Sequence, residues 1–212
     1  MKKGLLILAL CCIVFFSKAQ NEKTKGYLYL NGGANYASLY ASSKNASETG
    51  GGIFGPELGL SLRVKHKSYW GWGYEVGGYY SQKGTKFKDA DTKVTLDYAG
   101  VFVNGLLYFP LVNDDDIYIG GGIYSLYAFS GKSKSDTASS SIKFGDFWKR
   151  YDGGLQLKAA YEIKNFLALG LHYDFGFFPT FSSTDSRGDD FNGRNSVITL
   201  FASVKLVRLF GK

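Results

Sequence analysis

The sequence predicts an all-β protein, an eight-stranded antiparallel up-and-down transmembrane β-barrel with short periplasmic turns and long external loops. Apolar and polar residues alternate with a period of two in repeated stretches, and no helical period competes beyond residue 25. Short connections also alternate with long ones, as in outer-membrane barrels. With 45% hydrophobic residues, 28 Gly and only 3 Pro, the chain is neither disordered nor collagen-like.

Residues 1–19 have the features of a secretory signal peptide. Lys2 and Lys3 precede an apolar run, and Ser17 and Ala19 supply small residues at the cleavage site. We therefore expect cleavage between Ala19 and Gln20, which leaves residues 20–212 as the outer-membrane β-barrel domain.

Two other interpretations of this segment are weaker. The apolar run is shorter than the roughly 20 residues that a membrane-spanning helix needs. Cys11 or Cys12 would suit a lipoprotein, but Leu10 is larger than the small residue that usually precedes an acylated cysteine. Both cysteines leave with the signal peptide, so packing and backbone hydrogen bonds must stabilise the exported chain without disulfides.

The positive charge comes partly from the export signal. Removing Lys2, Lys3 and Lys18 lowers Lys+Arg from 25 to 22 against 18 Asp+Glu, so the net charge falls from +7 to +4. The remaining Lys and Arg residues are scattered rather than clustered, and we expect no nucleic-acid partner.

The strands are visible as alternating stretches such as "ELGLSLRVK", in which leucines and a valine alternate with polar residues and glycine. Three connections are short, around "KHKSY", "VNDDD" and "IKN", and four are long and polar. An even number of strands returns both chain ends to the periplasm. The eight predicted strands cover residues 25–37, 56–66, 70–83, 94–110, 117–130, 147–162, 166–179 and 196–210.

Glycine decides which face points inward, because the alternation alone fits a soluble barrel equally well. Gly73, Gly77, Gly154 and Gly170 all lie on the charged face. Glycine weakens a strand and gains nothing on a solvated surface, whereas the narrow interior of an eight-stranded barrel needs small residues beside large ones. The sequence therefore predicts a polar interior and an apolar exterior.

The predicted inward face carries equal numbers of opposite charges, as a mutually paired interior requires. An ion-selective pore would show an excess of one sign. The predicted interior acids are Glu57, Glu75, Asp97, Asp152, Glu162 and Asp174, and the predicted bases are Arg63, Lys65, Lys83, Arg150, Lys158 and Lys205, with His172 beside them.

An ordered set of segments resembles the PorT-like outer-membrane β-barrel family. The segments are "YYSQKG", "LDYAGVFVNGLLYFPL", "YIGGGIYSLYAFSGK", "YDGGLQLKAAYEI" and "LHYDFGFFPTF". The resemblance implies an eight-stranded barrel in the outer membrane of a Gram-negative bacterium. It implies no defined activity, although the family's namesake is linked to protein secretion and gliding.

We assign no catalytic, cofactor-binding or metal-binding residue. His66 is expected to be solvated in a turn, and His172 to join the interior hydrogen-bond network near Asp174. An enzyme built on His172, a hydrolase or acyltransferase, is the least favoured hypothesis. The acidic turn at residues 114–116 lacks a cage of calcium ligands.

The favoured function is that of a non-enzymatic integral outer-membrane protein whose external loops make surface contacts or shield the cell. The alternative is a narrow channel or an accessory subunit of an envelope secretion or transport machine. Expected partners are outer-membrane lipid and an unidentified envelope protein. The stretch "SDTAS" also resembles an O-glycan acceptor sequence, which would place a glycan on Thr137.

Overall fold

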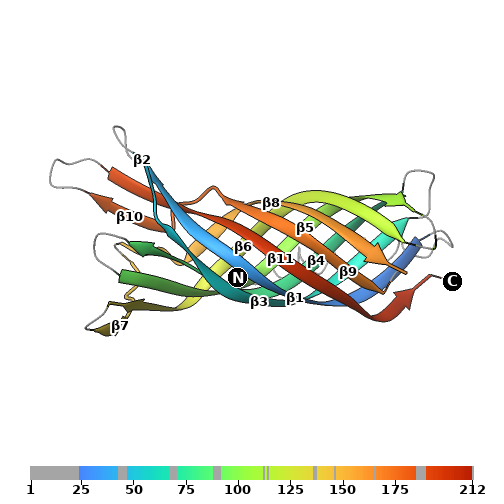
Figure 1. The fold of residues 1–212 in the computed structure, drawn as a ribbon, viewed down its shortest axis with the longest axis horizontal. Coiled ribbons are helices and arrows are strands. Elements are labelled where there is room, and N and C mark those ends of the chain that lie inside the picture. The colour runs from blue at the N-terminus through green and yellow to red at the C-terminus, as the bar shows by residue number, and fades with distance from the viewer. Residues whose placement is uncertain are drawn as a thin grey trace, which may run out of the picture.

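Eight long antiparallel strands form a closed wall (Figure 1). The computed structural model describes residues 24–42, 47–66, 71–87, 92–111, 113, 115–135, 138–145, 147–164, 166–184 and 190–211. The long strands are β1 (Thr24–Ser42), β3 (Gly51–His66), β4 (Gly71–Phe87), β5 (Thr92–Pro110), β6 (Asp116–Lys134), β8 (Tyr151–Ile163), β9 (Leu167–Gly176) and β11 (Asp190–Phe210). The predicted signal-peptide cleavage between Ala19 and Gln20 lies outside the described residues.

Each long strand pairs with its neighbour along the chain, and the first strand pairs with the last. The closing ladder between β1 and β11 extends from Gly26 opposite Phe210 to Ser42 opposite Asn192. A closed ring leaves no unpaired sheet edge, which is a condition for a sheet that spans a membrane. The predicted eight-stranded up-and-down barrel is therefore confirmed. Within the described part of the chain, no helix is long and apolar enough to cross a membrane.

The apolar side chains face outward. Along β5, Val101, Val103 and Leu107 are exposed, whereas the intervening Asn104 and Leu106 are buried. The same alternation exposes leucine, isoleucine, valine and aromatic residues around the whole ring, while charged residues are buried inside it. This distribution is the inverse of a soluble barrel and fits a wall surrounded by hydrocarbon.

The inward-facing glycines allow close approach between strands. A Cβ atom at Gly154 would lie 1.9 Å from the carbonyl oxygen of Phe175, and one at Gly122 would lie 1.9 Å from that of Val103. The outward-facing Gly32 would meet no atom within 4 Å. These inward glycines thus occupy places where a side chain does not fit. This agrees with the expectation that glycines lie on the crowded inner face of the barrel.

The end of the barrel with short connections is here called the turn end. There the Leu111 amide donates to the Asp115 carbonyl oxygen (2.8 Å) and the Phe166 amide to that of Ile163 (2.8 Å). Asn113 and Lys164 adopt positive φ angles of 66° and 46°. The Asp115 carboxylate accepts hydrogen bonds from the Tyr161 hydroxyl (2.5 Å) and the Lys164 amide (2.8 Å), and these bonds hold the pKa of that carboxyl below its usual value. The acidic turn therefore fixes the backbone of two adjacent connections.

The opposite end, here called the hairpin end, carries three short strands that the sequence did not predict (Figure 1). They are β2 (Ser47–Thr49), β7 (Ser139–Ser141) and β10 (Phe181–Thr184). The ring of Phe181 packs against Trp148 (5.0 Å between centroids) and Phe87 (6.3 Å). The connection between β4 and β5, expected to be long, is reduced to residues 88–91 because both strands continue past the predicted ends.

Candidate functional site

The interior of the barrel holds buried ion pairs in place of an open channel. Near the turn end, Arg63 bridges Glu75 (3.1 Å) and Glu162 (3.7 Å). Glu75 also receives the Lys158 ammonium at 2.6 Å and the Ser61 hydroxyl at 2.8 Å. Each side chain projects inward because it occupies the inward position of its strand, so residues distant in sequence meet across the lumen.

Aromatic rings surround the guanidinium group of Arg63. Its central carbon lies 4.1 Å from the ring centroid of Tyr29 and 4.7 Å from that of Tyr118. The Tyr29 hydroxyl donates to Glu162 at 2.5 Å. Cation–π contacts and charge-assisted hydrogen bonds together offset part of the cost of removing this cation from water.

A second network fills the half of the lumen nearer the hairpin end. Lys83 contacts Asp152 (3.1 Å) and Asp174 (3.3 Å). Asn195 donates to Asp152 at 2.9 Å, and Gln156 donates to Asp174 at 2.8 Å. The lysine and both carboxylates are fully buried, so these side chains fill the interior at this level of the barrel.

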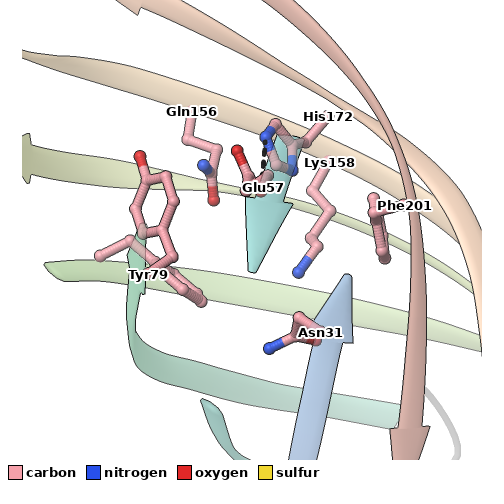
Figure 2. A pocket seen from close by; sticks show the side chains of 8 residues that line it. Asn31, Glu57, Tyr79, Gln156, Lys158, His172 and Phe201 are labelled. Carbon is pink, nitrogen blue, oxygen red and sulfur yellow. Dashed lines mark ion pairs between the residues drawn. The ribbon is translucent and has the colours of Figure 1, made fainter. Parts of the chain in front are cut away.

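A small cavity is lined by residues of both networks, among them Lys158 and Gln156 (Figure 2). Its volume of about 20 Å³ leaves room for about one water molecule. His172 lines the cavity, with Nε2 3.5 Å from Glu57 and 3.9 Å from Asp174, and its ring stacks on Phe201. The lining residues are Asn31, Glu57, Tyr79, Phe102, Gln156, Lys158, His172 and Phe201.

The surroundings of His172 resemble those of an ion-pair network more than those of an acid–base catalyst. Among the described residues that line the cavity there is no serine, threonine or cysteine that could act as a nucleophile. Among the described residues there is also no group of three or more His, Cys, Asp or Glu side chains placed to hold a metal ion. His66, expected in a solvated turn, instead ends β3, where it stacks on Trp72 and bonds to the Thr24 hydroxyl (2.8 Å).

Most of the sequence-predicted interior charges lie in these two networks or beside the cavity. They are Glu57, Arg63, Glu75, Lys83, Asp152, Lys158, Glu162, His172 and Asp174. Lys65 pairs with Asp116 at the turn end. Lys205 lies at the same end, partly exposed, with its ammonium 4.6 Å from the ring centroid of Tyr27.

The structure corrects two of the predicted positions. Asp97 lies on the outer face, where its carboxylate accepts hydrogen bonds from Tyr80 (2.8 Å) and Gln82 (2.9 Å). Both faces of β5 are largely apolar, so its single acidic residue did not indicate the orientation of the strand. Arg150 precedes β8, donates to the carbonyl oxygen of Ala128 (2.9 Å) and packs over a phenylalanine ring, outside the ion-pair networks.

Neutral members of the networks were missed, and so was Asp116. The neutral residues include Asn104, which donates to Gln156 at 2.7 Å, and Asn195. Gln156 shares the inward face of β8 with Asp152 and Lys158, so its position along the strand could have identified it. Asp116 was assigned to the acidic turn, although it is the first residue of β6 and is buried.

An apolar exterior, a closed ring of eight strands and a buried polar interior define a membrane-spanning β-barrel. The model of the outer membrane protein beta-barrel domain family matches residues 18–182, and the chain belongs to this family. It is an integral outer-membrane protein of a Gram-negative bacterium.

Several solved barrels are similar to this chain over most of its length. Neisserial surface protein A shares 15% identity, covering 84% of this chain and 97% of its own, with a TM-score of 0.44. OprG from Pseudomonas aeruginosa shares 14%, covering 88% and 98%, with a TM-score of 0.43. Ail of Yersinia pestis, solved in complex with the heparin analogue sucrose octasulfate, shares 13%, covering 86% and 99%, with a TM-score of 0.37. Among curated proteins, none matches the sequence.

Proposed function

We propose that this protein is a non-conducting, non-enzymatic outer-membrane barrel of the PorT-like kind that acts through its hairpin end, as a surface for contact or shielding. The observation that carries the proposal is the lumen, where Lys83, Asp152 and Asp174 are buried in mutual contact. Moving these groups apart to admit an ion would leave buried charges without partners, which is costly.

The hairpin end is built to present side chains outside the membrane. Beneath it, buried residues of β5 and β6 pack against Phe87, Ile142, Phe144 and Trp148, so that the mouth of the barrel is closed by apolar packing. Phe147 beside this cluster is exposed. A rigid, closed mouth with exposed groups above it suits contact with an envelope partner better than passage of a solute.

We expect the purified protein to give no sustained current in planar lipid bilayers. The ion pairs of the lumen leave no continuous aqueous path, and the wild type should therefore behave like protein-free bilayer at any applied voltage below bilayer rupture. A stable ohmic conductance whose ion selectivity changes in Glu75→Gln would contradict the proposal. Asp97→Asn is the matched control, because that carboxylate faces outward.

Thr137 lies outside the described residues, between β6 and β7, and we retain it as a proposed glycan acceptor at the hairpin end. We expect the intact mass of the protein isolated from its native envelope to exceed that of residues 20–212. The added mass should disappear in Thr137→Ala and persist in Ser135→Ala. A mass equal to the unmodified residues 20–212 would contradict the glycan and still support cleavage after Ala19.

A further inference from the structure

A groove lies on the outer wall of the barrel at the hairpin end, where three strands diverge. The strand β9 ends at Gly176, and its last pair with β11 joins Phe175 to Ser196. Pairing on this side of β11 resumes only where β10 begins, with Phe181 opposite Gly193. The groove that results, about 530 Å³ in volume, is bordered by β1, β9 and β11.

Besides Arg194, the groove is lined by the small residues Ser38, Gly176 and Ser196, by the aromatic residues Tyr40, Tyr173 and Phe175, and by Asn192 and Asn195. Ser38 and Ser196 face each other across the β1–β11 ladder. Tyr40 and Phe175 beside them are 48% and 47% exposed. The Tyr173 hydroxyl bonds to the Ser196 hydroxyl at 2.8 Å, which satisfies polar groups within the wall. The aromatic part of this lining suits a hydrocarbon chain, and the volume lies in the range of small-molecule sites.

The outer end of the groove is polar and cationic. Arg194 lines the groove, is exposed and lies opposite Tyr40 in the closing ladder. Along β11, Arg194 lies two residues beyond Ser196, which pairs with Phe175. This spacing corresponds to about 7 Å at the usual rise of a strand. Arginine binds phosphate through paired N–H donors, so the groove offers an apolar channel with a phosphate-binding group at its outer end.

We propose that this groove binds a phosphorylated glycolipid of the outer leaflet, with an acyl chain against Tyr40, Tyr173 and Phe175 and a phosphate on Arg194. Exposed aromatic residues, Tyr40, Phe175 and Phe177, lie in the groove or next to it in sequence, as is typical of a membrane interface, so lipid is the expected neighbour. The place of the groove at the external end selects the outer leaflet. The positive charge of Arg194 complements the phosphate, and the site is independent of what the hairpin end contacts.

The test is native mass spectrometry of the purified, folded protein in detergent, titrated with lipid A. We expect the wild type to retain one lipid A and Arg194→Gln to bind it about tenfold more weakly, as expected for loss of a charge-assisted hydrogen bond. Ser38→Leu should also weaken binding, because leucine would fill the groove without disturbing a lipid-facing wall. Arg208→Gln is the matched control, since Arg208 is exposed on the same strand at the turn end.

Three further arms separate the possible occupants. Dephosphorylated lipid A should bind the wild type as weakly as lipid A binds Arg194→Gln, and inorganic phosphate should not compete. Equal binding by Arg194→Gln and the wild type, or equal binding of phosphatidylglycerol and lipid A, would overturn the proposal. Failure of every lipid to bind the wild type would also overturn it. A heat-modifiable band on a gel shows that each variant is folded.

Discussion

Replacement of Glu75 by glutamine is expected to cost about 3–5 kcal/mol of unfolding free energy, the range for removing one partner of a buried charge pair. The Glu75 carboxylate lies between Arg63 (3.1 Å) and Lys158 (2.6 Å), and all three side chains are almost completely buried. Glutamine keeps the shape of the side chain but removes the carboxylate that pairs with Lys158 and leaves Arg63 with Glu162 as its ion-pair partner. Urea unfolding of protein reconstituted in lipid vesicles measures the difference.

The matched control for this variant is Asp97→Asn. Asp97 is also an acidic residue with two hydrogen-bond partners, but these are the neutral Tyr80 and Gln82, and the site is on the outer face. We expect a loss of about 1 kcal/mol or less, the range for an ordinary hydrogen bond. If Glu75→Gln and Asp97→Asn destabilise the protein equally, the ion-pair network contributes nothing specific to the barrel.

Arginine in place of Leu171 should reduce stability by roughly 2–4 kcal/mol, because it would place a charge against lipid near the middle of the membrane. Leu171 and His172 are adjacent in β9 and share the same depth, yet their side chains are 52% and 6% exposed. Far less Leu171→Arg than wild type should therefore reach the outer-membrane fraction as a folded, heat-modifiable band.

His172→Gln provides the comparison on the opposite face. Glutamine is uncharged, fits the polar cavity and retains the capacity to bond to Glu57, so we expect assembly close to that of the wild type. The same variant removes the imidazole on which any catalysis at this site would depend. Equal yields for Leu171→Arg and His172→Gln, or a wild type recovered from the soluble fraction, would contradict the outward placement of the apolar face.

The strand pattern and the orientation of the wall could be predicted because both follow from local rules. Alternation gives the strands, and inward glycines such as Gly154 identify the crowded face. In β5 this reasoning was wrong for Asp97, because Leu96 and Tyr98 face inward where the sequence suggested a polar interior. Leu96 and Tyr98 belong to the apolar cluster beneath the hairpin end. The cluster includes Ile142 and Trp148, which are distant in sequence, so the pattern of β5 alone could not reveal it.

Most charged members of the site could be predicted from the sequence, whereas most neutral members could not. A Lys or Asp at an inward position needs an oppositely charged partner, so its place in a network can be predicted. Asn104, Asn195 and Tyr124 are neutral and occur in many environments, so their residue type does not indicate a place in the network. The short strands β2, β7 and β10 were missed for a related reason. Their sequences, SET, SSS and FSST, are short and rich in serine, which is common in turns and loops, and each pairs along the edge of a long strand.

The pairing of the first strand with the last has a consequence for the order of folding. Gly26 meets Phe210 across the closing ladder, so the ring cannot close until nearly the whole chain has been made. Before that point β1 and β11 are both free edges, able to pair with other chains and to aggregate. Contacts across the lumen, such as that between Tyr29 and Glu162, also form late. We therefore expect slow closure, with the chain kept apart from its copies until it enters the membrane.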